Sequence, residues 1–247
     1  MKKALLIVKA IIFLSLNVNG QLWKLTRYEL SAAAGTTQFF GDIGGYPNDR
    51  NTLGLRDFSF HQTGLNLNAS MRDRLTRDVA VRLNLTGGFF HSTDAAGSKT
   101  TRGFESTTTF FESAVIGEYY FIKNKKEDSY LFLKGKRETL TSRDPSVDVY
   151  LLAGIGGLFY NVSPNTMLAP HATATNGFTA IVPLGLGVKY IFTHRVVLGF
   201  EFGARLTFSD NIDGYTSTGF NHNDIYQFYN LTFTYRLKTS RKQLTSF

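Results

Sequence analysis

The chain has 247 residues, no cysteine and a formal net charge of +8, and 14% of its residues are aromatic, including 22 Phe and 12 Tyr. The absence of cysteine excludes disulfides, thiolate metal sites, a cysteine nucleophile and a lipoprotein anchor. Nucleic-acid binding is not indicated, because the basic residues are spread along the chain.

The first 20 residues have the pattern of a secretory signal peptide. Lys2 and Lys3 precede an apolar run over 4–16, and short residues follow as far as Gly20. The run is too short for a transmembrane helix, and no later segment reaches the roughly 18 apolar residues that a spanning helix needs. We therefore expect cleavage near Gly20 and a mature protein that works outside the cytoplasm.

Eight later segments alternate apolar and polar residues with the period of two that is typical of β-strands. They span 26–40, 61–74, 79–91, 106–122, 146–160, 180–192, 196–208 and 224–238. Most reach the roughly 9 to 11 residues that a tilted strand needs to cross a bilayer. The predicted fold is all-β, an eight-stranded antiparallel transmembrane β-barrel over residues 21–238.

The connections alternate in length. The charged turn "RDRLTRD" joins segments two and three and "THR" joins six and seven, whereas the opposite side carries long polar loops such as "GDIGGYPNDRNTLGLRDFSF". This asymmetry is typical of an integral outer-membrane barrel with both termini in the periplasm and long extracellular loops. The stretch 123–146 is an exception to the short turns, because we expect it to form a long turn on the periplasmic side. The basic tail 239–247 should also lie in the periplasm.

The charged residues within the strands indicate which face is enclosed. Charges on the lipid face cost ~2–4 kcal/mol each at the membrane midplane, whereas enclosed charges are tolerable when paired. Because eight strands leave an interior only wide enough for side chains, we expect a lumenal ion-pair network and no conducting path. With the apolar face outside, its members are Glu29, Arg82, Glu112, Glu118, Lys189, Glu201, Arg205 and Arg236.

A soluble, lipocalin-like barrel with an apolar cavity is the alternative fold, and periodicity alone does not distinguish the two. The membrane barrel is favoured by the nearly unbroken apolar face of the last four segments, the long loops and the aromatic residues near strand ends. We expect interfacial girdles to include Tyr119, Tyr120, Phe121, Tyr190, Phe192, Tyr226, Phe228 and Tyr229.

The sequence offers little catalytic or metal chemistry. His222 and Asp224 could act as the acid–base pair of a membrane-embedded hydrolase, although polar loops contain such pairs by chance. Asp210 and Asp213 could bind calcium through oxygen ligands, but a solvated turn with Gly214 at a positive φ is the simpler interpretation. We expect no enzyme activity, no cofactor, no metal and no small-molecule substrate.

Basic residues gather in the two segments that would face the periplasm. They could dock an acidic or lipid-anchored partner, or they could only keep the turns soluble, and the length of the turn favours docking. The candidate docking residues are Lys123, Lys125, Lys126, Lys134, Lys136, Arg137, Arg143, Lys238, Arg241 and Lys242.

Several motifs occur in one order along the chain. They are "GDIGG" after the first segment, "FFESAVIGEYYF" in the fourth, "VYLLAGIGGLFYN" in the fifth, and "PLGLGVKY" followed by "LGFEFGARLTFSDNIDGYTS". Together they resemble the PorG-like outer-membrane barrel family of the type IX secretion system over nearly the whole mature chain. The resemblance implies an outer-membrane component that associates with a periplasmic ring formed by a lipoprotein and its partner.

The function predicted from these observations is a non-enzymatic anchor or accessory subunit of the secretion machinery. Its partners would be outer-membrane lipids and the periplasmic ring proteins. The alternative is a small surface barrel whose extracellular loops bind an external ligand or surface.

Overall fold

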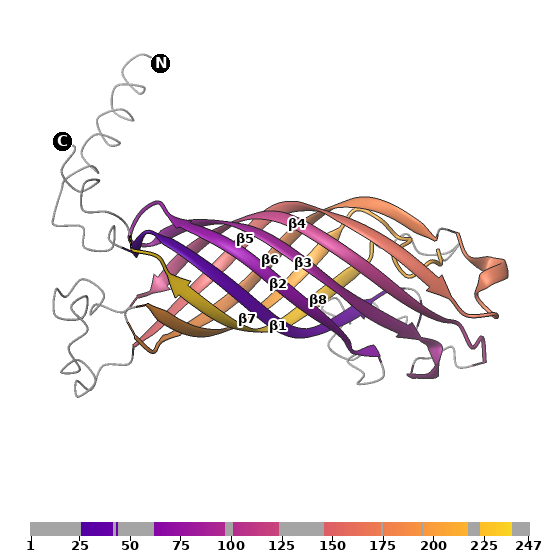
Figure 1. Cartoon of the computed structure of the whole chain (residues 1–247). Helices are drawn as coiled ribbons and strands as arrows, with labels where there is room; N and C mark the ends of the chain where they lie inside the picture. Colours follow the sequence, from indigo (N-terminus) through magenta and orange to yellow (C-terminus); the bar gives the residue numbers. More distant parts are fainter. Residues whose placement is uncertain are drawn as a thin grey trace, which may run out of the picture.

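The computed structural model describes residues 26–41, 43, 62–96, 101–123, 146–173, 175–193, 195–216 and 223–238. Eight antiparallel strands form one closed barrel, in which each strand pairs with its neighbour in sequence and β1 pairs with β8 (Figure 1). The strands are β1 (Tyr28–Phe40), β2 (Gly64–Arg74), β3 (Val79–Thr93), β4 (Glu105–Ile122), β5 (Val147–Pro164), β6 (Asn176–Ile191), β7 (Val196–Thr207) and β8 (Ile225–Arg236). The predicted fold class is confirmed.

Two short 3-10 turns, η3 (Asp94–Ala96) and η6 (Ala169–His171), follow β3 and β5. In the part of the chain that the structure describes, no helix is long and apolar enough to cross a membrane. The predicted signal peptide, 1–20, and the tail, 239–247, lie outside the described residues.

Strands β5 and β6 extend further than the sequence pattern indicated. The predicted ends were 160 and 180, but Asn161 pairs with Asn176 and Leu158 pairs with Thr179 in the observed register. At this level the exposed wall includes the polar Asn161 and Asn176 beside the apolar Phe178, and the backbone pairing of the sheet continues past the predicted strand ends. At the other end of β4, a register shift between Tyr120 and Ile122 marks a β-bulge against β5.

The two ends of the barrel differ in their connections. The start of β1, the end of β8 and the short turns 75–78 and 192–195 share one end, on the left in Figure 1, which we call the terminal end. The connection from β4 to β5 leaves and enters the sheet at this same end. The other four connections leave and enter the sheet at the opposite end, which we call the loop end.

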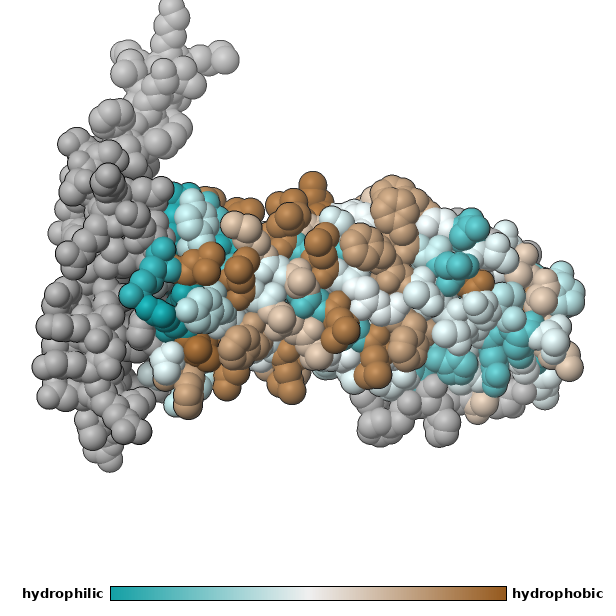
Figure 2. Space-filling model, viewed as in Figure 1, coloured by the Kyte–Doolittle hydropathy of each residue, from teal (hydrophilic) through white to brown (hydrophobic). Residues whose placement is uncertain are grey.

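The outer wall of the barrel is apolar. Leu67, Ile155 and Leu231, on three different strands, are each at least 70% exposed. Figure 2 shows apolar side chains over the middle of the visible face and polar residues towards the loop end. An apolar exterior of this extent is matched by hydrocarbon and not by water, so the lipocalin-like alternative is wrong and the barrel has the architecture of an outer-membrane protein.

The loop-end half of the lumen is filled by aromatic and aliphatic side chains, which the sequence pattern did not predict. Phe90 is fully buried and its ring stacks on Phe39, with centroids 4.5 Å apart. The cluster comprises Phe39, Phe90, Phe110, Leu158, Tyr160, Val162, Ile181, Ile212, Tyr226 and Phe228. This half of the barrel therefore has a packed apolar core inside its wall.

Three of the aromatic residues that were expected at the membrane interface lie inside the lumen instead. Tyr120, Tyr226 and Phe228 are buried, because each belongs to the inward-facing set of its strand. The expectation was wrong here because it relied on distance from the strand end and ignored the alternation of faces. Tyr119, Phe121, Tyr190 and Phe192 are exposed, and Tyr229 is half-buried on the wall beside Phe202.

Candidate functional site

The terminal-end half of the lumen is filled by charged side chains, and Glu29 of β1 lies among several of the cations. Its carboxylate accepts hydrogen bonds from Arg72 at 2.9 Å, Arg236 at 3.0 Å and Lys189 at 3.3 Å. Arg74 lies 3.7 Å away. All five side chains are buried, and because they come from β1, β2, β6 and β8, the cluster ties four strands together through the lumen.

Arg72 connects this cluster to Glu118 on β4. Its Nε and Nη2 donate to the two carboxylate oxygens of Glu118 at 2.7 and 2.8 Å. Tyr120 also donates to Glu118, at 2.7 Å, and the ammonium of Lys189 donates to the Tyr120 hydroxyl. Paired, charge-assisted hydrogen bonds of this geometry are the arrangement that makes buried charges tolerable.

Arg82 extends the network across the barrel. It reaches Glu201 on β7 with two hydrogen bonds, of 2.7 and 3.0 Å, and its Nε lies 3.3 Å from Glu118. Tyr150 donates to the same Glu201 carboxylate at 2.9 Å. The ring of Tyr150 has room because residue 187 is glycine, where a Cβ would lie 2.0 Å from the Tyr150 ring.

A separate ion pair lies nearer the loop end. The Nε of Arg205 is 3.5 Å from Glu112, which also accepts a 2.8 Å hydrogen bond from Tyr226. The guanidinium of Arg205 lies over the Phe228 ring, 4.3 Å from its centroid. This pair therefore contacts the aromatic cluster directly.

The structure places all eight of the expected lumenal residues inside the barrel and adds three that sequence reasoning missed. Arg72, Arg74 and Asp148 are also buried in the lumen. The predicted second segment already ended at residue 74, but the two arginines also stand in the charged turn "RDRLTRD" and were left out of the inward-facing set, to which both belong. Extending the alternation of Asn66, Asn68 and Ser70 by two more steps would have found them.

The described loops pack together at the loop end. Arg102 donates two hydrogen bonds, of 2.8 and 2.9 Å, to the buried carboxylate of Asp94, and Asp94 raises the pKa of the guanidinium above its usual value. The same guanidinium lies over the rings of Phe104 and Tyr215, at 4.5 and 4.8 Å. His171 packs beside Phe104. Three different loops thus meet in one cluster of charge and aromatic rings.

The acidic residues of the last loop stabilise backbone turns. Asp224 is buried and accepts the backbone N–H of Ile212 at 2.9 Å. Asp213, also buried, accepts those of Ile43 and Tyr215. Gly214 has a φ of 87°, so the predicted positive φ is confirmed. No group of three or more His, Cys, Asp or Glu side chains among the described residues is placed to hold a metal ion.

Only part of the expected docking surface is described, and it lies at the terminal end. Lys238 is exposed just beyond β8, and the ammonium of Lys123 lies 4.3 Å from the centroid of the Tyr120 ring. The other candidates, together with His222, lie outside the described residues; those candidates are Lys125, Lys126, Lys134, Lys136, Arg137, Arg143, Arg241 and Lys242.

Solved structures with similar architecture include several barrels of bacterial outer membranes. Neisserial surface protein A is 14% identical, with a TM-score of 0.48 over 85% of this chain and 97% of that chain. Ail of Yersinia pestis, in complex with the heparin analogue sucrose octasulfate, is 10% identical with a TM-score of 0.41 over 85% and 99%. OprG from Pseudomonas aeruginosa is 7% identical with a TM-score of 0.43 over 87% and 98%.

No curated protein matches this chain significantly in sequence. The sequence profile of a domain of unknown function, DUF6089, matches residues 3–241. Since this match covers nearly the whole chain, the protein is a member of the DUF6089 family.

Proposed function

We propose that this protein is an integral outer-membrane subunit of the type IX protein secretion machinery, with both termini in the periplasm. In this role it anchors periplasmic ring components, a lipoprotein and its partner, to the membrane. The basic segment 123–146 and the tail 239–247 supply the docking surface. The proposal rests on the family resemblance of the strand motifs and on the charge of these two segments.

The observation that supports this proposal best is the filled lumen. The two-point contact between Arg82 and Glu201 spans the terminal-end half, and the ring stack of Phe90 and Phe39 occupies the loop-end half. A barrel that is packed from end to end is suited to anchoring and not to transport through its interior. Function is then expected on its ends or on its outer wall.

The terminal end offers the stronger attachment point of the two ends. The connection 123–146 joins β4 and β5, which have 18 residues each, and it leaves and enters the sheet at the same end of the barrel as the end of β8, on the opposite side of the wall. Within it, Lys123, Lys125, Lys126, Lys134, Lys136, Arg137 and Arg143 outnumber the acids Glu127, Asp128, Glu138 and Asp144. An acidic partner surface would be attracted to this excess of positive charge.

The test is to delete residues 124–144 in the full chain and to identify proteins that co-purify with the barrel in mild detergent. We expect the variant to fold and to lose its periplasmic partners, and we expect wild-type binding to weaken as salt increases. A matched variant that replaces 124–144 with an uncharged Gly/Ser linker of equal length separates charge from length. Retention of the ring proteins by both variants would refute the docking proposal.

A surface barrel that binds an external ligand is the second candidate, and the ordered cluster around Arg102 favours it. Under that function, exchanging the loops of the loop end would change binding, and the 124–144 deletion would have no effect. The loop exchange and the 124–144 deletion together therefore distinguish the two candidates.

A further inference from the structure

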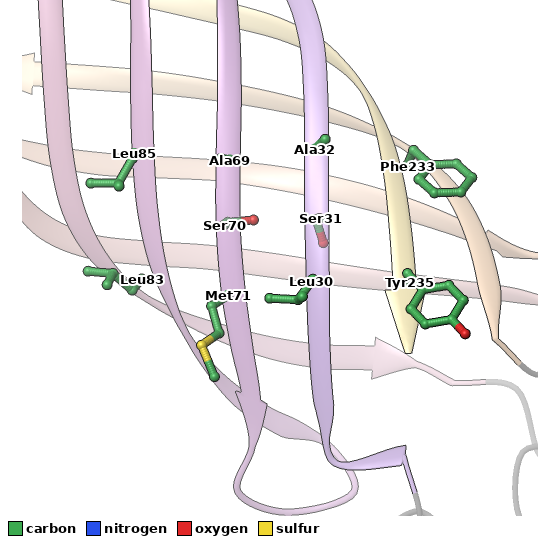
Figure 3. A pocket seen from close by; sticks show the side chains of 10 residues that line it. All are labelled: Leu30, Ser31, Ala32, Ala69, Ser70, Met71, Leu83, Leu85, Phe233 and Tyr235. Atoms are coloured by element: carbon green, nitrogen blue, oxygen red, sulfur yellow. The ribbon is translucent and has the colours of Figure 1, made fainter. Parts of the chain in front are cut away.

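A recess in the outer wall lies at the seam where β8, β1, β2 and β3 lie side by side. It has a volume of about 490 Å³ and is lined almost wholly by apolar atoms (Figure 3). The lining residues are Leu30, Ser31, Ala32, Ala69, Ser70, Met71, Leu83, Leu85, Phe233 and Tyr235. This volume falls within the roughly 300–1,000 Å³ typical of ligand pockets.

The strand register explains why the wall is hollow here. Phe233 pairs with Ala32, Ala32 with Ala69, and Ala69 with Leu85. One row across four strands therefore has a large side chain at each edge and two alanines in the middle. The two alanine methyl groups form the floor of the recess, and the side chains of Phe233 and Leu85 form its walls. The walls stand three strand spacings apart, about 14 Å between backbones.

The recess opens towards a cationic rim at the terminal end. The hydroxyl of Tyr235 lies 3.4 Å from a guanidinium nitrogen of Arg195. Arg195 forms no ion pair with a carboxylate among the described residues, whereas nearby Arg27 is paired with Asp73 at 2.5 Å. Lys238 is exposed. It lies on the same rim, because the backbone N–H of the preceding residue, Leu237, donates to the carbonyl of Tyr28 at the start of β1.

We propose that this recess is a binding site for one anionic phospholipid from the leaflet at the terminal end. An acyl chain lies over Ala32 and Ala69, between Phe233 and Leu85, and the phosphate is held by Arg195 with Lys238 beside it. Apolar walls match an acyl chain, and a cation at the membrane surface attracts an anionic headgroup.

A second copy of this chain fits the recess less well. Two-fold pairing through the recess would place the same surface against itself, so the Arg195 and Lys238 of both copies would gather at one rim. Like charges brought together in this way oppose association. A flexible acyl chain can also contact the floor of the recess at Ala32 and Ala69, which the convex wall of another barrel does not reach.

The acyl-chain half of the proposal is tested by native mass spectrometry of the full-length barrel in mild detergent. Phosphatidylglycerol and phosphatidylethanolamine with identical acyl chains are added in equal amounts. We expect wild type to retain one phosphatidylglycerol, and Ala32→Phe to retain neither lipid because the new ring fills the floor. The matched control is Ala153→Phe on the outward face of β5, away from the recess, which keeps the lipid.

The headgroup half is tested with Arg195→Gln. Loss of one cation at the membrane surface reduces the preference for phosphatidylglycerol about fivefold, whereas Arg195→Lys keeps it. Arg102→Gln, at the opposite end of the barrel, leaves the preference unchanged. Folding of every variant is checked by its electrophoretic mobility before and after heating.

Three results would overturn the proposal. They are equal lipid retention by wild type and Ala32→Phe, no retained lipid on wild type, and a wild-type dimer that Ala32→Phe abolishes. The last result would assign the recess to a second copy.

Discussion

Arg82 on β3 and Glu201 on β7 face each other across the lumen and form two parallel hydrogen bonds, Nη1 to Oε2 at 2.7 Å and Nη2 to Oε1 at 3.0 Å. The two residues are 119 positions apart in sequence. Both are buried, so neither charge can be hydrated if the other is lost. The two charges are compensated only when β3 and β7 face each other in the closed barrel, so the pair stabilises the correctly closed structure.

Substituting Glu201→Gln should destabilise the folded barrel by about 3 kcal/mol, because the buried Arg82 would lose its two-point carboxylate partner and keep only the 3.3 Å contact with Glu118. The double variant Arg82→Met with Glu201→Leu should cost less than the single one, since no charge is left unpaired. The fraction of folded barrel against urea concentration, read from electrophoretic mobility, measures both. A single variant that unfolds at the wild-type midpoint would contradict this account.

Arg72→Met should be at least as destabilising, by about 3–5 kcal/mol, because it removes hydrogen bonds from both Glu29 and Glu118. Arg77→Met provides the control, since Arg77 is exposed in the turn between β2 and β3, and its effect should stay within about 0.5 kcal/mol. The same urea titration compares them. Equal midpoints for the two variants would show that the lumenal network contributes little.

Gly187→Ala should destabilise the barrel by about 1–3 kcal/mol through overpacking. The new methyl group would collide with the Tyr150 ring and displace its hydroxyl from Glu201. Gly117→Ala on the neighbouring part of the wall is the matched variant, because its Cβ would meet only a carbonyl oxygen at 3.6 Å. We expect Gly117→Ala to unfold at the same urea midpoint as wild type. A lower midpoint for Gly117→Ala than for Gly187→Ala would refute the steric explanation.

The wild-type barrel should form no steady ion channel in a planar bilayer. Ion pairs fill the terminal-end half of its lumen and the aromatic cluster fills the loop-end half. Current recordings at several voltages after insertion of the purified barrel measure this. A stable conductance of constant size would mean that the lumen opens in the membrane.

Arg102→Ala should loosen the loop end and leave the barrel wall intact. The substitution removes both hydrogen bonds to Asp94 and the contacts with Phe104 and Tyr215. Limited proteolysis should then cut the connection between β3 and β4 faster, with no change in the urea midpoint. Arg102→Lys, which keeps the charge but not the two-point geometry, should give an intermediate rate.

The sequence predicts correctly which side chains of a strand face the membrane and which face the lumen wherever apolar and polar residues alternate regularly. Leu198 and Phe200 face outward, and Glu201 and Arg205 face inward, because a period of two separates the faces within a single strand. The method failed at Arg72 and Arg74, where a run of charges resembled a turn. The same reasoning failed at Tyr226 and Phe228, because their position near the strand end was given more weight than the alternation that places them in the inward-facing set.

The candidate docking residues rest on charge alone, and most of them lie outside the described part of the chain, so docking stays a prediction. The lipid site could not have been predicted, because the small residues Ala32 and Ala69 come from different strands. Only the register between β1 and β2 places them side by side.

The sequence by itself determined the number of strands, the apolar outer face and the enclosure of charge, because these follow from local periodicity along each strand. Closure of the barrel decided the rest. It placed Arg82 opposite Glu201, stacked Phe90 on Phe39 and aligned Ala32 with Ala69. These contacts join residues far apart in sequence, so their partners depend on register and on the curvature of the closed sheet, which no single strand encodes.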